Sequence, residues 1–491
     1  MAKSRTDPTE GTPFEAVIGL EVHAQLKTRT KIFCGCENRF GAEPNTLTCP
    51  VCLGQPGALP VVNRAAVEYA MLVGLAAGSE IARFTKFDRK NYYYPDLPKN
   101  YQISQFDLPL CTGGFIDVYV RETKRRIGLT RIHLEEDAGK NIHAEGRAES
   151  WIDLNRAGVP LLEIVSRPDL RTPEEAGAYL KMLRLMLLYL GVSDCNMEEG
   201  SLRCDVNASI RPRGAANLET RTEIKNLNSF TNVENALSYE IGRQIKLRTG
   251  GGEVVQQTLL FDPGRQETRV LRGKEEAHDY RYFPEPDLAP LTFTAEEVER
   301  LRSVLPEMPV SRFERFQSAF GLAAYHADVL VRDPGMAGFF EECVRLYAKP
   351  EAAQAIANWV VNAVREEANT RGGSVADSGM APARLVELIR AIDEGKVSNQ
   401  KARDVFKAMM GTAEPVGEII RSLGLEQISD DAPLRVAVEE VIAAHPGPVE
   451  DVRKGKKNSI NFLVGQVMKK TRGQANPPRV AKMIEEALAA R

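Results

Sequence analysis

Ser201-Leu-Arg-Cys-Asp-Val-Asn-Ala-Ser-Ile210 decides the fold class of the N-terminal part of this 491-residue chain. Successive side chains of a strand point to opposite faces, so this alternating stretch predicts a half-buried strand. One face carries Leu202, Cys204, Val206, Ala208 and Ile210, and the other carries Arg203, Asp205, Asn207 and Ser209. The polar face is typical either of an ordinary solvated sheet or of a site that holds a metal ion and phosphates.

Other stretches of the chain have the same polar pattern. Residues 14–27 alternate in the same way and place Glu21 and His23 on one strand face, where they can share one ion. A further predicted strand, residues 126–136, ends at Glu135 and Glu136, and Glu223 lies on a later strand. The candidate cations that would neutralise a transferring phosphoryl group are Lys90, Arg203 and Lys225.

The chain lacks both glycine-rich nucleotide motifs, Gly-x-Gly-x-x-Gly and Gly-x4-Gly-Lys-Ser/Thr. If the protein uses ATP, metal ions held by carboxylates must therefore bridge the phosphates. The alternative is that these residues belong to solvated strand faces with ordinary ion pairs, because spacing alone does not show that they meet in space.

The composition excludes several classes of protein. The formal net charge is −3, so any contact with nucleic acid must come from a local basic patch. No run of about 18 apolar residues occurs, and the N-terminus has no signal-peptide core, so we expect a cytoplasmic protein. Residues 1–13 are polar, and we expect them to be a disordered tail.

The order of the predicted elements indicates the fold class. Strands and a few helices without a regular βαβ rhythm predict an α+β domain with an antiparallel sheet over residues 14–293. Within this domain, Thr172, Pro173 and Glu175 predict the start of a helix with a capping box, and Gly191 predicts its end. We expect a second helix over about residues 232–247.

The composition changes near residue 290. Three prolines between residues 284 and 290 indicate a linker, and Thr294 to Glu297 predicts the start of a new helix. Helical patterns follow almost to the end of the chain. We therefore predict a helical domain over residues 294–411 and a helical tail domain over residues 412–491.

Four of the eight cysteines gather within residues 34–52, at Cys34, Cys36, Cys49 and Cys52. Two closely spaced pairs separated by twelve residues predict a structural Zn²⁺ site, because four thiolates complete a tetrahedron. The alternatives are four reduced thiols without a metal and a redox dithiol. A redox dithiol would be expected in a thioredoxin-like βαβ context, which is absent from the sequence.

Two further segments have a composition typical of ligand contact. Residues 86–105 are dense in aromatic, basic and amide groups, which is typical of a loop that shapes a pocket or packs on the surface. Residues 453–482 contain nine basic and no acidic residues, among them Lys456, Lys457, Lys469, Lys470 and Arg472. This segment predicts a contact with an RNA phosphate backbone, and a solvated basic face is the alternative.

Several long motifs resemble those of a known family. They include Ile18-Gly-Leu-Glu-Val-His23, Tyr101-Gln-Ile-Ser-Gln-Phe106, His133-Leu-Glu-Glu-Asp-Ala-Gly-Lys140, Asp153-Leu-Asn-Arg-Ala-Gly-Val-Pro160, Glu223-Ile-Lys-Asn-Leu-Asn-Ser-Phe230 and Phe462-Leu-Val-Gly-Gln466. The motifs resemble the B subunits of the aspartyl/glutamyl-tRNA amidotransferases (GatB), and the resemblance covers essentially the full chain.

The resemblance implies a ligase that forms carbon–nitrogen bonds with glutamine as the amido donor. Family members use ATP and Mg²⁺ to phosphorylate the side-chain carboxylate of Glu-tRNA(Gln) or Asp-tRNA(Asn). Ammonia released from glutamine in a separate amidase subunit then displaces the phosphate, and a small third subunit holds the other two together. The implied fold is a glutamine synthetase-like cradle, followed by helical domains that end in a YqeY-like, tRNA-binding tail.

The resemblance also implies roles for particular residues. Mg²⁺ would be held by Glu21, His23 and Glu136, with Glu135, Asp205 and Glu223 as further carboxylates of the catalytic site. The ammonia route would be lined by Lys90 and Lys99. ATP or the tRNA 3′ end would be bound by Asn155, Arg203 and Lys225. Zn²⁺ would be a structural ion at the four cysteines.

Two other classes of protein remain open at this stage. One is a non-catalytic RNA-binding scaffold stapled by zinc, and the other is a zinc hydrolase. Four thiolate ligands leave no open position on the metal, which disfavours the hydrolase. Inward-facing carboxylates would repel phosphates unless metal ions intervene, which disfavours the scaffold. ATP consumption distinguishes the ligase from the scaffold.

Overall fold

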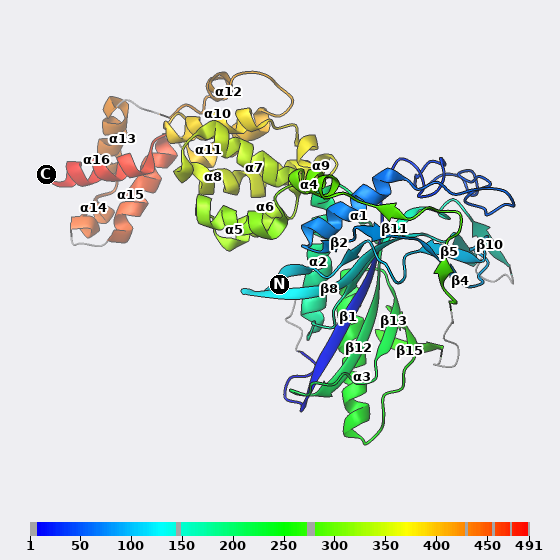
Figure 1. Cartoon of the computed structure of the whole chain (residues 1–491). Coiled ribbons are helices and arrows are strands. Elements are labelled where there is room, and N and C mark those ends of the chain that lie inside the picture. The colour runs from blue at the N-terminus through cyan, green and yellow to red at the C-terminus, as the bar shows by residue number, and fades with distance from the viewer. Residues whose placement is uncertain are drawn as a thin grey trace. The chain divides into compact units, whose positions relative to one another are not determined.

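The computed structural model describes residues 7–143, 149–272, 280–427, 431–453, 457–471 and 474–489. The chain divides into two compact units, Met1–Val310 and Ser311–Arg491. The first unit is built on a large sheet, and the second is helical (Figure 1).

The central sheet of the first unit has the strand order β15-β14-β13-β12-β1-β11-β8-β6-β2, and β7 pairs with β8. The strands of this sheet are β1 (Phe14–Gln25), β2 (Glu80–Ile81), β6 (Cys111–Thr112), β7 (Phe115–Val120), β8 (Thr123–Glu136), β11 (Pro160–Ser166), β12 (Leu202–Pro212), β13 (Thr222–Leu227), β14 (Thr258–Asp262) and β15 (Glu267–Arg272). The predicted strand over residues 14–27 is thus confirmed, and β1 lies between β11 and β12.

Three small sheets accompany the central one among the described residues. The strands β4 (Asp88–Asn91), β5 (Tyr101–Ser104) and β16 (Phe283–Pro284) form the largest of them. The other two pair β9 (Lys140–His143) with β10 (Ser150–Asp153), and β3 (Phe84–Thr85) with β17 (Leu291–Thr292). The aromatic segment over residues 86–105 therefore contains two short strands joined by a loop.

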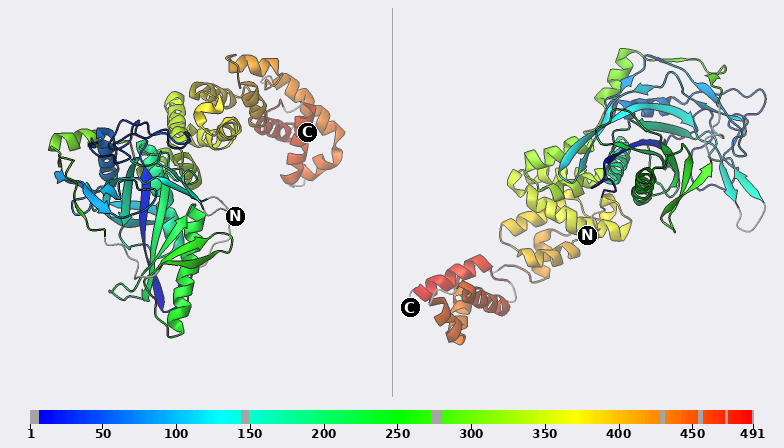
Figure 2. Two further views of the ribbon diagram at one scale, coloured as in Figure 1. Left: turned by 90° about the vertical axis from the view of Figure 1, so that its right-hand side faces the viewer. Right: turned by 90° about the horizontal axis from the view of Figure 1, so that it is seen from below.

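Three helices cover the apolar face of the central sheet: α1 (Arg64–Ala76), α2 (Pro173–Leu190) and α3 (Phe230–Thr249) (Figure 2). Alternate residues of β1, such as Ile18 and Leu20, are buried in one core with Tyr179 and Leu183 of α2. Because successive side chains of a strand point to opposite faces, the polar residues of the same strands lie together on the face that these helices do not cover.

The ends of α2 agree with the sequence signals except in one detail. Thr172 caps the helix by accepting from the Glu175 N–H, and Gly191 ends it with a φ of 67°. The predicted capping box is not formed, because the Glu175 carboxylate accepts at 2.6 Å from the Arg171 N–H, one residue before the cap. A complete capping box does form at Thr294 and Glu297, at the start of α4 (Ala295–Ser303).

The sheet is mixed, whereas the sequence predicted an antiparallel one. Among the described strands of this sheet, only the neighbours β13 and β14 run parallel to each other. The helix α3 connects these two strands, and a crossover of this length is what a parallel neighbour requires. The remaining pairs of the central sheet are antiparallel, and the α+β class is confirmed.

The described part of the expected N-terminal tail is ordered. Residues 1–6 lie outside the described residues, but Thr9 is buried and bonds to Asp7 through its hydroxyl group. The guanidinium group of Arg213 donates to the carbonyl oxygens of Thr9 and Phe14. The expectation of disorder is therefore wrong for residues 7–13, because these contacts fix the segment to the end of β12.

The predicted domain boundaries differ from the packing. The helix α4 belongs to the first unit, because Leu301 is buried in its core and Arg300 pairs with Glu68 of α1 at 2.7 Å. At the other predicted boundary, α12 (Val416–Ser422) buries Val416 and Ile419 in the core of the preceding helices. Both cores thus extend beyond residues 293 and 411.

The second unit contains two separate helical cores. The first core is formed by α5 (Pro309–Phe320), α6 (Ala324–Val331), α7 (Pro334–Tyr347), α8 (Ala353–Trp359), α10 (Pro382–Asp393), α11 (Asn399–Ala408) and α12, with α9 (Arg365–Arg371) and short 3-10 and π segments. The second core is formed by α13 (Asp431–Ala444), α14 (Pro446–Arg453), α15 (Lys457–Lys470) and α16 (Pro477–Ala489). Within the described residues, no helix is both long and apolar enough to span a bilayer.

Candidate functional site

The neighbouring strands β1, β11 and β8 bring a row of ionisable residues together on the polar face of the sheet. In the strand register, His23 lies opposite Glu163, and Glu163 lies opposite His133. Glu21 and Glu135 stand two residues from His23 and His133 on the same face. We call these five residues the carboxylate–histidine cluster.

The members of the carboxylate–histidine cluster are close enough to share metal ions. The Nε2 atom of His23 is 3.5 Å from Glu163, 3.7 Å from Glu21 and 3.8 Å from Glu135. The Nε2 atom of His133 is 3.7 Å from Glu163 and 3.9 Å from Glu135. Two triplets, one of Glu21, His23 and Glu163 and one of His133, Glu135 and Glu163, each have ligand atoms within 4.8 Å of one another.

Charge interactions within the cluster shift its pKa values. Burial alone would raise the pKa of Glu163, but the adjacent imidazoles of His133 and His23 lower it. Burial would lower the pKa of His23, but a hydrogen bond with Glu163 and the charges of Glu135 and Glu163 raise it. The pKa of Glu21 is raised by burial and by the negative charge of Glu163. The imidazoles therefore offset part of the negative charge of the three carboxylates, and further cations would stabilise it.

Two cations of the protein already face this charge. Arg131 donates to Glu163 at 2.9 Å, and it lies on β8 two residues before His133. Burial would lower the pKa of Lys90 on β4, but the carboxylates of Glu135 and Glu163 raise it well above the usual range. Lys90 therefore stays charged beside the cluster, with its Nζ atom 4.9 Å from the ring centroid of Tyr280.

A second charged group continues along the same face. Asp205 lies opposite Glu21 in the register of β12 and β1. Lys225 on β13 binds Asp205 at 2.6 Å and Glu223 at 3.0 Å, so these predicted residues do meet. Arg203 is directed to Asp137 instead, which it contacts at 2.7 Å.

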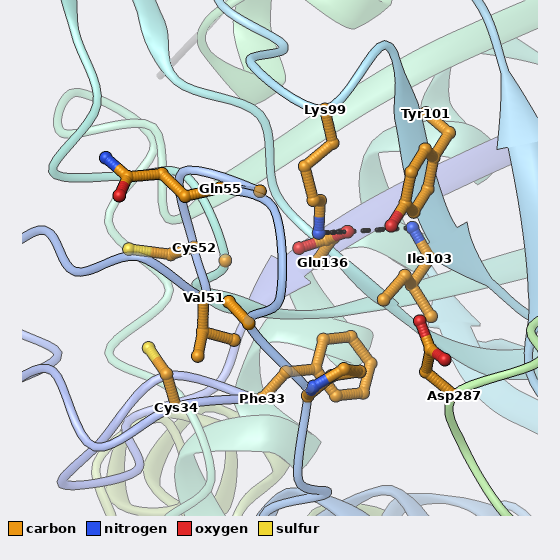
Figure 3. A pocket seen from close by; sticks show the side chains of 14 residues that line it. Phe33, Cys34, Val51, Cys52, Gln55, Lys99, Tyr101, Ile103, Glu136 and Asp287 are labelled. Carbon is orange, nitrogen blue, oxygen red and sulfur yellow. Dashed lines mark hydrogen bonds and ion pairs between the residues drawn. The ribbon is translucent and has the colours of Figure 1, made fainter.

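Glu136 does not join the carboxylate–histidine cluster, although the family resemblance implied that it would be a Mg²⁺ ligand with Glu21 and His23. It follows Glu135 directly on β8, so its side chain points to the other side of the strand. Its carboxylate there accepts hydrogen bonds from Lys99 and, at 2.8 Å, from the Ile103 N–H (Figure 3).

The Lys99–Glu136 pair lies in the wall of a cavity of about 110 Å³. Its lining includes both apolar and polar residues, among them Phe33, Cys52, Tyr101 and Ile103 (Figure 3). Both charged side chains are less than a tenth exposed. The resemblance grouped Lys90 with Lys99, but the structure separates them, because Lys90 faces Glu135 and Lys99 binds Glu136.

The four clustered cysteines converge as the spacing predicts. The sulfur atoms of Cys34, Cys36, Cys49 and Cys52 all lie within 4.8 Å of one another. A tetrahedral zinc ion with bonds of about 2.3 Å needs sulfur atoms roughly 3.8 Å apart, and Cys49 and Cys52 are 3.9 Å apart. The pKa of the Cys52 thiol is lowered to about 5, chiefly by its hydrogen bond with Cys34. The donor set therefore fits Zn²⁺.

Asn155, which the family resemblance made a ligand of ATP or the tRNA 3′ end, forms hydrogen bonds within the protein. Its side-chain oxygen accepts from the Leu47 N–H at 2.8 Å, and its amide donates to the Glu43 carbonyl at 2.7 Å. Its hydrogen bonds are thus used to hold the cysteine-containing segment against the loop that precedes β11.

The predicted tRNA-binding residues lie at the ends of α15. Lys456 and Arg472 fall outside the described residues, and Lys457 begins the helix. Lys469 and Lys470 are exposed in its last turn, where Lys470 forms an ion pair with Glu440 of α13. Part of the basic charge is thus offset within the tail.

Three residues of the site, Glu163, His133 and Arg131, were not predicted from the sequence. Glu163 is the lone carboxylate in the apolar strand Pro160–Ser166, and burying a lone carboxylate is costly unless a cation or metal binds it. His133 is in phase with Glu135 on β8, so strand alternation would have placed both on the polar face. These signals were present but weaker than those of the motifs.

Comparison with known proteins identifies the family of the chain. The model of the GatB/GatE catalytic domain matches residues 16–299, and the model of the GatB domain matches residues 338–488. Similar proteins are named as the B subunits of aspartyl/glutamyl-tRNA(Asn/Gln) amidotransferases. The one from Moorella thermoacetica is 52% identical over 97% of this chain and 100% of its own length. Those from Nitratidesulfovibrio vulgaris and Carboxydothermus hydrogenoformans are 52% and 50% identical, over 97% of this chain and 99% of theirs. The chain therefore belongs to the GatB family, the B subunits of tRNA-dependent amidotransferases.

Proposed function

We propose that this protein activates the side-chain carboxylate of Glu-tRNA(Gln), Asp-tRNA(Asn) or both with ATP, and then amidates it. The observation that carries this proposal is the largely buried carboxylate–histidine cluster beside Lys90, on the polar face of the central sheet. Its partners would be an amidase subunit, which supplies ammonia from glutamine, and a small third subunit.

The reaction needs activation because a carboxylate has no good leaving group. One oxygen of the substrate carboxylate attacks the γ-phosphorus of ATP, the bond to the β–γ bridging oxygen breaks, and ADP leaves. Ammonia then attacks the carbonyl carbon of the acyl phosphate through its lone pair. The carbon–oxygen bond to phosphate breaks, phosphate leaves, and the nitrogen loses a proton to give the amide.

The protein's own side chains would position the phosphates. Lys90 stays charged because of Glu135 and Glu163, so it can offset the negative charge that moves with the γ-phosphoryl group. Lys225 lies on the same face, where it bridges Asp205 and Glu223. The five cluster residues would hold the Mg²⁺ ions, which supply charge neutralisation to the phosphoryl oxygens.

Ammonia requires a separate and dry route, because in water it is largely protonated to ammonium. Ammonium has no free electron pair with which to attack the acyl phosphate. The cavity at Lys99 and Glu136 supports this part of the proposal, since it lies on the other side of β8 from the cluster and its ion pair is buried. In this view Glu136 belongs to the ammonia route, and Glu163 takes the place among the metal ligands that the family resemblance gave to Glu136.

The direct test is ATP hydrolysis by the protein assembled with the amidase and small subunits, with and without Glu-tRNA(Gln) and Mg²⁺. The proposal predicts that the misacylated tRNA stimulates phosphate release, and that glutamine then yields Gln-tRNA(Gln). Tight tRNA binding without any ATP turnover would contradict it and would favour a tRNA-holding scaffold.

A further inference from the structure

We propose that the zinc site controls the Lys99–Glu136 ion pair, with Gly54 and Lys31 as the positioning residues that connect the two. This inference rests on the proposed function, because it assigns the metal-bound loop a role in ammonia delivery beyond that of a staple. Two close contacts between the cysteine loop and the ion pair, and a buried lysine beside Cys52, support it.

The first contact joins the zinc loop to Lys99. Cys49 to Gln55 form a turn in which the Leu53 N–H donates to the Cys49 carbonyl and the Gly54 N–H to that of Val51. A Cβ atom built on Gly54 would lie 2.3 Å from Cγ of Lys99. The aliphatic part of Lys99 therefore lies directly on the Gly54 backbone, and the position of this turn sets the path of the lysine to Glu136.

The second contact surrounds Gly158. A Cβ atom there would lie 3.4 Å from Cβ of Cys52, 3.6 Å from Cδ of Lys31 and 3.9 Å from the Glu136 carboxylate. One glycine backbone thus separates a zinc ligand from the carboxylate of the ion pair. Any shift of Cys52 on metal loss would reach Glu136 through a single residue.

The buried lysine beside Cys52 contributes electrostatically. Lys31 is fully buried, with its Nζ atom 3.7 Å from the Cys52 sulfur and 3.5 Å from the Leu154 carbonyl oxygen. A buried ammonium group needs a negative partner. Four thiolates around Zn²⁺ carry a net charge of −2, so Lys31 would offset half of it and hold Cys52 in place.

The consequence is a coupling between metal binding and passage through the cavity. With zinc bound, the turn supports Lys99 in its pair with Glu136, and the polar wall of the cavity is formed. Without zinc, the turn loses its anchor, so the pair and the Ile103 N–H bond to Glu136 should loosen. Nitrogen from glutamine would then reach the reaction poorly, whereas ATP-dependent activation at the cluster would persist.

The test uses the full complex with the amidase and small subunits, and a matched pair of variants. Gly54→Ala adds a methyl group against Lys99, whereas Gly57→Ala adds one in open space, and both glycines have a positive φ (65° and 85°). The strain of alanine at a positive φ is therefore common to both variants. Amidation is measured with glutamine and, separately, with ammonium chloride.

We expect Gly54→Ala to lower the glutamine-to-ammonium activity ratio by roughly tenfold, and Gly57→Ala to leave it near the wild-type value. An unchanged ratio in a folded, zinc-containing Gly54→Ala variant would overturn the inference. If the wild-type complex amidated tRNA with neither nitrogen source, the proposed function itself would fail.

A second readout does not depend on activity or on the folding of a variant. Hydrogen exchange of the wild-type complex is compared before and after zinc removal by a chelator, with Mg²⁺ restored. We expect faster exchange in peptides that contain Ile103, whose N–H donates to Glu136. Peptides from β12 should be unchanged. Equal protection of Ile103 with and without zinc would overturn the coupling.

Discussion

Three consecutive acids at the end of β8 form three different sets of contacts. Glu135 faces the carboxylate–histidine cluster, and Glu136 pairs with Lys99 in the cavity wall. Asp137 accepts hydrogen bonds from Arg203 and Gln25, both at 2.7 Å. The third acid therefore joins the end of β8 to β1 and β12 in the interior of the central sheet.

Asp137→Asn should lower the free energy of unfolding by about 1 kcal/mol at pH 7, because it removes the buried negative charge that pairs with the partly exposed Arg203 and Arg156. Burial would raise the pKa of Asp137, but Arg203 and Arg156 lower it. A depressed pKa contributes stability above the ordinary aspartate range, and this contribution is lost as the pH falls through the folded-state pKa. Calorimetry should therefore show a difference in the free energy of unfolding between wild type and variant that is constant from pH 8 to 5 and decreases only below about pH 4. A difference that disappears by pH 6 would contradict this account.

Lys31→Met should accelerate zinc loss to a competing chelator by about 10- to 100-fold, because it removes the cation next to Cys52. The rate is measured with a zinc-sensitive dye. Lys27→Met changes an exposed lysine four residues earlier and should release zinc at the wild-type rate. Equal rates in both variants would show that Lys31 does not stabilise the thiolates.

At the residue scale, sequence reasoning succeeded where a pattern limits the choices. Four cysteines at short spacings define a metal site, and they converge. Glu21 and His23 were placed on one face by strand alternation. The same rule separates Glu136 from Glu135, whereas the family resemblance grouped Glu136 with Glu21 and His23. Asn155 was unpredictable, because its partners Leu47 and Glu43 lie more than 100 residues away in sequence.

At the element scale, the sequence marks both the start and the end of α2 clearly. Thr172 and Gly191 delimit it as predicted, and its apolar face is buried against the sheet. The direction of β14 was harder to foresee, because its neighbour β13 precedes it by a whole helix. Local periodicity identifies a strand but does not identify its neighbour.

Thr172→Ala should destabilise the first unit by about 1 kcal/mol, because it removes the hydroxyl that accepts from the Glu175 N–H. Thr172→Ser keeps the hydroxyl and is the matched control, so it should lower the stability of the first unit much less. Denaturant unfolding of both variants measures the difference. If serine and alanine are equally destabilising, the methyl group rather than the cap is responsible.

At the scale of the whole molecule, the second unit has two helical cores, and the basic segment lies on the second. The sequence predicted helices in both regions but placed the boundaries inside packed cores. A boundary depends on which buried side chains meet, as Leu301 and Val416 show, and composition does not encode such contacts.

The tail is the proposed contact for the tRNA backbone. Lys469→Glu should weaken tRNA binding and reduce the salt slope of the affinity by about one, as for the loss of one phosphate contact. Lys407→Glu, a charge reversal on α11, should change the slope little. Filter binding at several salt concentrations gives both slopes, and equal slopes in the two variants would place the RNA contact outside the tail.

The central claim is that the carboxylate–histidine cluster carries phosphoryl transfer. It is tested by single-turnover trapping of the acyl phosphate with hydroxylamine, in complexes supplied with ATP, Mg²⁺ and Glu-tRNA(Gln) but no glutamine or ammonium. The side-chain hydroxamate is measured apart from the α-hydroxamate that hydroxylamine forms with the aminoacyl ester. We predict that Glu163→Gln slows hydroxamate formation by about 10²-fold or more, whereas Glu136→Gln still forms it and loses only the glutamine-dependent step. Normal trapping in Glu163→Gln, or an equal loss in both variants, would contradict the account.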